Sequence, residues 1–397
     1  MAQLPTSCDV LVVGAGPAGS ACAQALARAG LDVVLADQHA FPRDKTCGDG
    51  LIPDAHAALR RLGVFDAVMA LAQPVAHVSC FGPRGGRVDV PGSLAVLPRR
   101  TLDDILYRAA LAAGARALPP ARFDGLQTDT AGRVNGATLT IAGRPHALGC
   151  RWLVLATGAT PPAMVAAGLC ERRAPSGIAL RGYVHHPGLR ERLSTLQIVW
   201  HKRLAGGYGW IFPLPDDVYN VGAGYTGGYA ARDSSNLRTL FAAFAEVHAD
   251  ARALLDRGTW VGELKGAPLR CSLAGARWSR PGLLATGEAI GSTYAFTGEG
   301  IGKAMETGLL AAEAITAGGN DSAVRDRYAA ALRALKPRFD LYQKAEHVNR
   351  RPWLTDLVIW RASRSPRILR RMSGVLEETQ NPGRLLSWRG VMKLMTE

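Results

Sequence analysis

The first forty residues show a strand–helix–strand pattern of apolar and polar positions. Residues 8–14 form a continuous apolar run, which is typical of a strand buried on both faces of a parallel sheet. Residues 18–29 are rich in alanine and lead to Gly30, a residue type that commonly follows a helix end. Residues 31–36 form a second apolar run, which ends at Asp37. The pattern predicts a compact βαβ unit.

Two later blocks, residues 75–97 and 177–224, carry aromatic and β-branched residues between glycine and proline breaks, which indicates an antiparallel sheet. Residues 234–254 have the apolar spacing of one amphipathic helix. After Gly282 the glycine-rich α/β pattern returns and leads into a helix from about Gly300 to Ala317. We therefore predict an α/β fold: a Rossmann-like nucleotide-binding domain with an inserted antiparallel-sheet substrate domain and a helical C-terminal region. The nucleotide domain is predicted to comprise residues 1–74, 98–172 and 272–320, the sheet domain residues 75–97 and 173–271, and the helical region residues 321–397.

Length and composition support an enzyme with more than one core. A chain of 397 residues exceeds the size at which a single hydrophobic core stops growing. No apolar run approaches the ~20 residues that a membrane-spanning helix needs. The seven cysteines include no CxxC pair, and the first residues do not resemble a secretory leader. We expect reduced thiols in a cytoplasmic protein, either free or peripheral at the inner membrane surface.

The formal net charge of +14 admits several partners. It is compatible with nucleic acid, an anionic membrane surface, phosphorylated ligands, or a basic surface that binds nothing. No nucleic-acid-binding module is recognisable in the sequence, so nucleic acid is not an expected partner.

A glycine-rich motif lies directly after the first predicted strand. It places Gly14 for a tight turn, Gly16 for close approach of a pyrophosphate and Gly19 for close helix packing. The helix that follows directs free N–H groups and a partial positive charge toward the phosphates. Asp37, 18 residues after Gly19, is positioned to accept hydrogen bonds from ribose hydroxyls. The predicted dinucleotide-binding residues here are Gly14, Gly16, Pro17, Ala18, Gly19 and Asp37.

A second GxGxxG match, residues 222–227, follows another strand but opens no helix. No further strand ending in an acid follows it at βαβ spacing. We interpret it as a glycine-rich strand or turn of the sheet domain, so no second dinucleotide domain is predicted.

A third glycine-containing region resembles the para-hydroxybenzoate hydroxylase-like FAD superfamily. Residues 284–289 (Leu-Ala-Thr-Gly-Glu-Ala) and 297–301 (Thr-Gly-Glu-Gly-Ile) match its pattern of a strand, Gly-Asp-Ala, a loop, and Gly-x-Gly at a helix start. The resemblance implies that Glu288, here in place of the usual aspartate, contacts the ribityl chain of FAD. It also implies that the helix start faces the flavin ring, where its N–H groups stabilise reduced flavin. The residues implied to bind FAD are Gly287, Glu288, Gly298, Gly300 and Ile301.

Within that superfamily the chain most resembles the geranylgeranyl reductase family. Three stretches match the family patterns PRxKxCGxGL, RxxFDxxL and YxWxFP: residues 42–51, 99–106 and 208–213. The resemblance implies that Arg43 and Arg99 lie along the FAD, that Cys47 and Gly48 border the flavin ring, and that Tyr208, Trp210, Phe212 and Pro213 line the substrate cavity. Without it, an aromatic strand is more often part of a core, and a single cysteine is more often an inert thiol.

Two departures separate this chain from the oxygen-using members of the superfamily. Flavin hydroxylases usually carry Asp-Gly after the strand that here spans residues 153–156, but this chain continues Thr157-Gly158. Halogenases have WxWxIP where this chain has YxWxFP, and they present a lysine toward the flavin. Lys45 follows the reductase pattern instead.

The C-terminal region alternates apolar and basic residues. Tryptophan and leucine at Trp353, Leu354 and Trp360 are interleaved with arginines such as Arg361 and Arg364. The pattern suits basic helices on an anionic membrane surface. It equally suits helices packed against the nucleotide domain with an arginine-rich outer face.

The leading hypothesis is an FAD-dependent reductase that saturates carbon–carbon double bonds of a prenyl-type or other apolar, lipid-like substrate. Catalysis is expected around Cys47, Gly48, Tyr208 and Trp210, with electrons from NAD(P)H or a separate reductase. One alternative is a flavin-dependent monooxygenase or halogenase acting on an aromatic small molecule or protein side chain. Another is a non-catalytic electron-transfer flavoprotein. A reductase or carrier protein is a candidate partner, and no metal site is expected.

Overall fold

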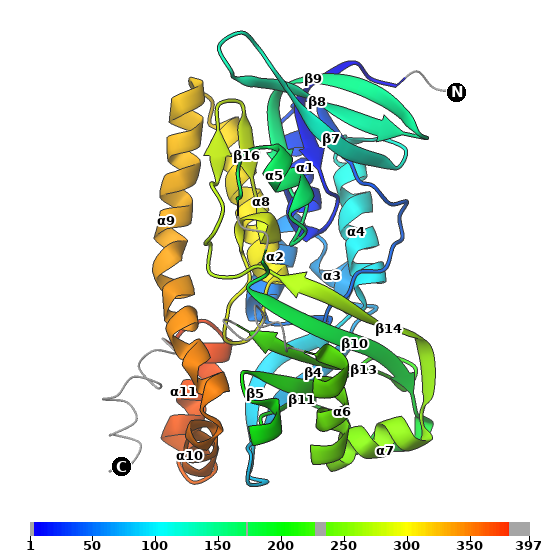
Figure 1. Ribbon diagram of the computed structural model, residues 1–397, viewed down its shortest axis with the longest axis vertical. Coiled ribbons are helices and arrows are strands. Elements are labelled where there is room, and N and C mark those ends of the chain that lie inside the picture. Colours follow the sequence, from blue (N-terminus) through cyan, green and yellow to red (C-terminus); the bar gives the residue numbers. More distant parts are fainter. Residues whose placement is uncertain (1–3, 172–173, 227–235, 381–397) are drawn as a thin grey trace.

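The computed structural model describes residues 4–171, 174–226 and 236–380, and it contains two eight-stranded sheets. The first sheet and its helices occupy the upper part of Figure 1, and the second sheet occupies the lower part. The long helix α9 (Asp321–Ala345) runs along one side of the molecule. The predicted mixed α/β class with a helical C-terminal region is confirmed.

The first sheet has a parallel centre with the order β16-β9-β1-β2-β6. Its central strands are apolar on both faces because helices cover the sheet, as expected for parallel strands. The short strand β15 (Ser279–Arg280) extends one edge in antiparallel sense, β8 pairs with the first half of β9, and β7 pairs with β8. The other strands of this sheet are β1 (Ser7–Val13), β2 (Val33–Ala36), β6 (Arg116–Ala117), β7 (Ala121–Thr128), β8 (Val134–Ile141), β9 (Arg144–Leu155) and β16 (Leu283–Ala285).

Two helices cross closely beside this sheet, α1 (Pro17–Arg28) and α8 (Ile301–Thr316). A Cβ atom on Gly308 would lie 2.2 Å from the carbonyl oxygen of Ala18, so only glycine permits this approach. The crossing places the start of α8 beside the glycine turn that opens α1. The remaining helices around the sheet are α2 (Pro53–Leu62), α3 (Phe65–Met69), α4 (Arg99–Ala112) and α5 (Pro162–Ala166).

The second sheet has the order β14-β10-β13-β12-β11-β4-β5-β3 and is antiparallel except for the β11–β4 pair. It is assembled from three separate stretches of the chain. Its strands are β3 (Gly50–Leu51), β4 (Gln73–Phe81), β5 (Arg87–Val96), β10 (Gly177–His185), β11 (Leu196–Val199), β12 (Gly207–Pro213), β13 (Val218–Thr226) and β14 (Thr259–Leu269).

The stretch expected to be helical over residues 234–254 is helical over most of its described residues but is divided into two helices, and residues 234 and 235 lie outside the described residues. The first, α6, spans Leu237–Val247, and the second, α7, spans Ala249–Arg257. His248 between them has an extended backbone (φ −118°, ψ 114°), and its ring hydrogen-bonds the side chain of Gln197 in β11 at 2.7 Å. Docking of His248 onto the sheet breaks a helix that apolar spacing alone would continue.

The second GxGxxG match forms no nucleotide turn over its described residues, 222–226. These residues lie within β13, between β10 and β12. Gly222 is required for packing, because a Cβ atom there would lie 2.1 Å from the Trp210 ring. Residue 227 lies outside the described residues. The interpretation of this segment as a glycine-rich strand is confirmed.

The last two helices, α10 (Pro352–Ala362) and α11 (Pro366–Leu376), cover the second sheet at β5. Ile359 and Ile368 are buried there with the apolar side chains of β4 and β5. The alternative that these helices pack on the nucleotide domain holds only at the end of α11, where Val375 also contacts the apolar core of the first sheet. None of the helices in the described ranges is both long and apolar enough to cross a membrane.

Candidate active site

One cavity of about 940 Å³ joins the two halves of the protein. It begins at the glycine turn after β1, passes between the second sheet and the start of α8, and ends under the inner faces of α10 and α11. Predicted site residues from five separate sequence motifs line it: Gly14, Gly16, Pro17, Ala18, Asp37, Arg43, Cys47, Gly48, Arg99, Tyr208, Trp210, Phe212, Glu288, Gly298, Gly300 and Ile301. The predicted residues Gly19, Pro213 and Gly287 do not line it.

Backbone geometry explains the glycines of the first turn. Gly14 has φ +101°, and a Cβ there would lie 2.3 Å from the carbonyl oxygen of Ala156. A Cβ on Gly19 would lie 1.7 Å from the carbonyl oxygen of Gly14, so the helix could not approach the strand. Gly16 precedes α1, and no side chain caps the helix start. The free N–H groups of α1 therefore face the cavity.

Two arginine side chains lie beside the glycine turn that opens α1. The terminal nitrogens of Arg43 and Arg99 lie 3.5 and 3.8 Å from the position of a Cβ on Gly16. Asp103 holds both: it accepts two hydrogen bonds from Arg99 (2.6 and 2.8 Å) and pairs with Arg43 at 3.1 Å. Burial alone would lower the pKa of Arg99, but Asp103 raises it, so the guanidinium stays charged. Helix N–H groups and two fixed cations suit a pyrophosphate.

Asp37 lines the cavity, and its carboxylate also stabilises the glycine turn through hydrogen bonds. Its Oδ2 accepts a hydrogen bond from the Ala15 N–H at 2.9 Å, and its Oδ1 accepts one from the His39 N–H at 3.0 Å. The carboxylate therefore holds the glycine turn against the end of β2. Its hydrogen bonds to ribose hydroxyls stay a prediction.

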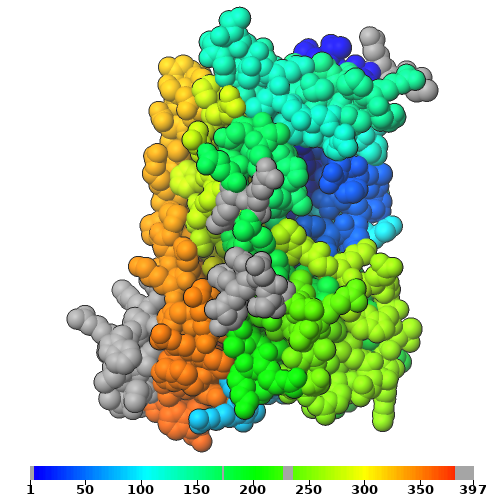
Figure 2. Space-filling model, viewed as in Figure 1, coloured from blue at the N-terminus to red at the C-terminus, as the bar shows by residue number. Residues whose placement is uncertain are grey.

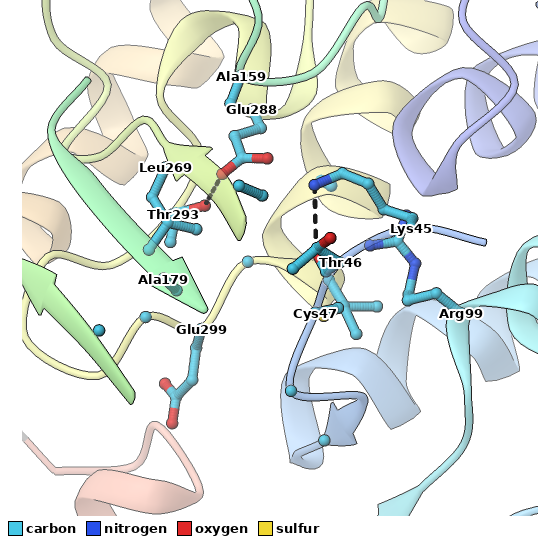
Figure 3. Close-up of a pocket in the computed structure, with 18 of the residues that line it drawn as sticks. Lys45, Thr46, Cys47, Arg99, Ala159, Ala179, Leu269, Glu288, Thr293 and Glu299 are labelled. Carbon is cyan, nitrogen blue, oxygen red and sulfur yellow. Dashed lines mark hydrogen bonds between the residues drawn. The ribbon is translucent and has the colours of Figure 1, made fainter. Parts of the chain in front are cut away.

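Glu288 lies on the opposite wall of the cavity from Lys45, Cys47 and Arg99 (Figure 3). Its Oε1 accepts long hydrogen bonds of 3.4 Å from the Arg270 N–H and the Thr293 hydroxyl. Gly287 before it has φ +68°, and a Cβ there would lie 2.6 Å from Ala18. The extra methylene relative to aspartate is thus accommodated with the carboxylate still at the cavity wall.

The backbone at the start of α8 packs so closely against neighbouring side chains that two of its positions must be glycine. A Cβ on Gly300 would lie 2.6 Å from the Thr293 hydroxyl, and a Cβ on Gly298, which has φ +73°, would lie 2.7 Å from the Tyr208 hydroxyl. Tyr208 in turn donates a hydrogen bond to the Thr297 carbonyl oxygen at 2.5 Å. The start of α8 was predicted to face the flavin ring. The aromatic strand β12 therefore holds this helix start in place through Tyr208.

The Cys47–Gly48 segment lies against the same strand. A Cβ on Gly48 would lie 3.1 Å from the Phe212 ring and 3.7 Å from the Trp210 indole nitrogen. Burial raises the pKa of the Cys47 thiol, although the nearby Arg99 lowers it. Cys47 therefore lines the cavity as a thiol rather than as a thiolate. Its role in chemistry stays a prediction.

Sequence reasoning missed a buried polar network behind this segment. Asn220 in β13 donates hydrogen bonds to the Cys47 carbonyl (2.7 Å) and to Asp49 (2.8 Å), and it accepts one from the Trp210 indole (2.9 Å). Asp49 also accepts hydrogen bonds from the Tyr183 hydroxyl (2.6 Å) and the Arg99 N–H (3.2 Å). An asparagine inside an apolar strand is the signal that could have identified this network.

The second half of the cavity is apolar. Trp200 and Phe212 also line the cavity, and the walls of this half come from β4, β5, β11, α10 and α11, with Ile52 after β3. The apolar side chains that line it are Ile52, Val78, Cys80, Val90, Leu196, Ile198, Val358, Ile359, Met372, Val375 and Leu376.

Comparison with known proteins agrees with this geometry. A family model described as an FAD binding domain matches residues 7–185. Menaquinone reductase of Mycolicibacterium smegmatis is 34% identical over 79% of this chain and 78% of its own length. Digeranylgeranylglycerophospholipid reductase 2 of Methanopyrus kandleri is 30% identical over 77% of this chain and 76% of its own length.

Solved structures show the same fold. The flavin-dependent brominase Bmp2 superposes with a TM-score of 0.76 at 19% identity, covering 98% of both chains. A geranylgeranyl bacteriochlorophyll reductase-like protein of Thermoplasma acidophilum superposes with a TM-score of 0.69 at 20% identity, covering 99% of this chain and 97% of its own.

Fold and site together define an FAD-dependent oxidoreductase. The chain belongs to the geranylgeranyl reductase family, within the para-hydroxybenzoate hydroxylase-like FAD proteins, as its sequence motifs predicted.

Arg43 provides a test of the proposed pyrophosphate site. In the Arg43→Gln variant one of the two cations is lost, and Asp37 and Asp103 are left partly uncompensated beside the phosphates. We expect the Kd for FAD, measured by flavin fluorescence titration, to rise about tenfold or more. Arg84→Gln is the control, because that side chain is 87% exposed and lies outside the cavity. An unchanged Kd in Arg43→Gln would place the pyrophosphate elsewhere.

Proposed function

We propose that this protein reduces carbon–carbon double bonds in the prenyl-type chain of a lipid-like substrate. The observation that carries the proposal is the continuous cavity, whose FAD-facing half opens into a long apolar half. A compact aromatic substrate would fill little of that second half. Two relatives with at least 30% identity are named as reductases of menaquinone and of digeranylgeranylglycerophospholipid, which supports the assignment.

FAD, when bound and reduced, supplies a hydride from its N5 atom. The chain itself holds the cofactor and shapes the site around it. The residues proposed to hold FAD are Gly14, Gly16, Pro17, Ala18, Gly19, Asp37, Arg43, Cys47, Arg99, Gly287, Glu288, Gly298, Gly300 and Ile301.

The substrate half of the site acts by positioning and by excluding water. Tyr208 and Trp210 are fixed by hydrogen bonds to Thr297 and Asn220, so the aromatic wall is held in one arrangement. An apolar chain that enters between this wall and α10 displaces water from the reacting double bond. Cys47 and Gly48, which pack against the same aromatic strand, would border that bond as well.

Anaerobic turnover tests the proposal. Holoenzyme reduced with dithionite is mixed with menaquinone or a geranylgeranyl lipid, and flavin reoxidation is followed with product mass. We expect the flavin to reoxidise and the product to gain two hydrogens. The fold likeness to a brominase supplies the rival hypothesis. If neither lipid reoxidises the reduced enzyme, but oxygen produces the absorbance of a flavin hydroperoxide, the result would favour that oxygenase function. Inertness in both assays would favour an electron carrier.

Val358 tests whether the chain occupies the apolar half of the cavity. Its side chain lines that half from α10, so Val358→Trp would fill space that a long prenyl chain needs. We expect KM for a geranylgeranyl substrate to rise about tenfold or more while KM for a short prenyl analogue stays unchanged. The matched control is Leu357→Trp, since Leu357 packs beside Leu354 outside the cavity. Equal effects on both substrates would contradict the placement.

We further propose that the outer face of α10 and α11 contacts an anionic membrane surface. Trp353 and Trp360 on α10 are 54% and 47% exposed, although the inner face of the same helix is buried. Arginines stack on Trp360 at 4.9 and 5.5 Å, and Figure 2 shows these helices at the lower left surface in orange. A lipid substrate could pass from the bilayer into the cavity beneath. The electron donor, NAD(P)H or a separate reductase, is not needed for this step.

Vesicle binding tests the membrane contact. We expect the protein to sediment with vesicles that contain phosphatidylglycerol, and salt to weaken the binding because it is partly electrostatic. Replacing Trp353 and Trp360 by serine should reduce the bound fraction severalfold. Trp260→Ser is the control, since this tryptophan is 40% exposed on β14, far from α10 in the sheet order. Equal loss in both variants, or no binding at all, would contradict the contact.

A further inference from the structure

Glu299 is the carboxylic acid at the junction of the two cavity halves. It lies between Gly298 and Gly300 at the start of α8 and lines the cavity. In Figure 3 its side chain points away from Cys47 and Arg99, toward the C-terminal helices. Tyr208 and Tyr342, one from each side of the junction, are near enough to feel its charge. The proposed function gives this residue no task.

The surroundings of Glu299 contain more carboxyl groups than cations. Lys303 is 4% exposed and pairs with Glu306 at 2.8 Å, Glu378 at 3.0 Å and Asp54 at 3.7 Å. Arg338 binds Glu378 at 2.6 Å. Four carboxyl groups thus face two cations in a mostly buried region, so they cannot all be ionised at low cost. The groups that interact with Glu299 from the packed elements are Asp54 of α2, Tyr208 of β12, Thr297 before α8, Lys303 of α8, Tyr342 of α9 and Glu378 after α11. Glu306 and Arg338 pair in turn with Lys303 and Glu378.

Burial favours the neutral form of two carboxyl groups in this cluster, Glu299 and Asp54. Burial, reinforced by the charge of Asp54, raises the pKa of Glu299 to about 8. Burial also raises the pKa of Asp54, to about 7, and Lys303 opposes the shift. Asp54 lies against the first turn of α8, where a Cβ on Gly302 would be 2.4 Å from its carboxyl carbon. Of the two groups, Glu299 is the one that lines the cavity.

We propose that Glu299 is the acid that gives its proton to the substrate double bond. The inference rests on the proposed function. An isolated alkene has no carbonyl group to accept negative charge, so hydride addition needs a proton at the same time. Two C–H bonds form: one carbon receives the hydride from reduced flavin, which is thereby oxidised, and the other receives the Glu299 proton as its O–H bond breaks. The resulting carboxylate regains a proton from bulk water.

The Glu299→Gln variant tests the proposal, since it keeps the shape of the side chain but cannot donate an acidic proton. We expect reoxidation of reduced flavin by a geranylgeranyl substrate to slow by about 10²–10⁴-fold, with FAD affinity unchanged. In the wild type, the rate should fall as pH rises through about 8, because the acid is then deprotonated, and this limb should vanish in the variant. Glu313→Gln, on the exposed side of the same helix, is the control.

A measurement on the substrate-free protein separates this inference from the proposed function. Infrared difference spectra between neutral and alkaline pH should show the carbonyl bands of protonated carboxyl groups, and the band of Glu299 should be absent in Glu299→Gln while that of Asp54 remains. A variant whose reoxidation rate is within about twofold of the wild type, or a missing band, overturns the role of Glu299 while leaving the reductase function standing. If the wild type shows the band but reduces no prenyl substrate, the proposed function fails and the proton transfer with it.

Discussion

The buried carboxylate of Asp49 is the interaction on which the active-site geometry depends. It receives hydrogen bonds from the Arg99 backbone, the Tyr183 hydroxyl and the Asn220 amide, which belong to α4, β10 and β13. Burial raises its pKa to about 6, and these donors and nearby Arg181 oppose the shift, so it is mostly ionised at neutral pH. One charge therefore ties the Cys47 segment to α4 and to the second sheet, and its removal would leave several buried donors without a partner.

The hydrogen bonds to Asp49 explain how residues far apart in the chain come to line one cavity. Arg43 and Cys47 lie on the segment that Asp49 anchors, so the cation over the glycine turn and the thiol beside Trp210 are positioned together. Asn220 then fixes the indole of Trp210 on the neighbouring strand of the second sheet. The FAD-binding half and the apolar half are thus linked through buried hydrogen bonds, which suits a reaction that excludes water.

Much of this arrangement was predictable from local patterns. The βαβ unit, the glycine turn, the sheet segments and the family follow from short motifs with a physical requirement at each glycine, as at Gly14. The break at His248 could not be predicted, because a long-range bond to Gln197 overrides helical spacing. The packing of α10 on the second sheet and the proton held by Glu299 also depend on contacts between distant segments, such as those with Asp54 and Glu378. A single sequence carries no local signal for such contacts.

The most direct test of the central claim is a crystal structure of the reduced holoenzyme with a geranylgeranyl chain bound. The account predicts the flavin ring beside Cys47 and the start of α8, with the chain running past Trp210 into the space under α10 and α11. A chain bound outside that space, or a flavin ring directed away from the start of α8, would contradict it.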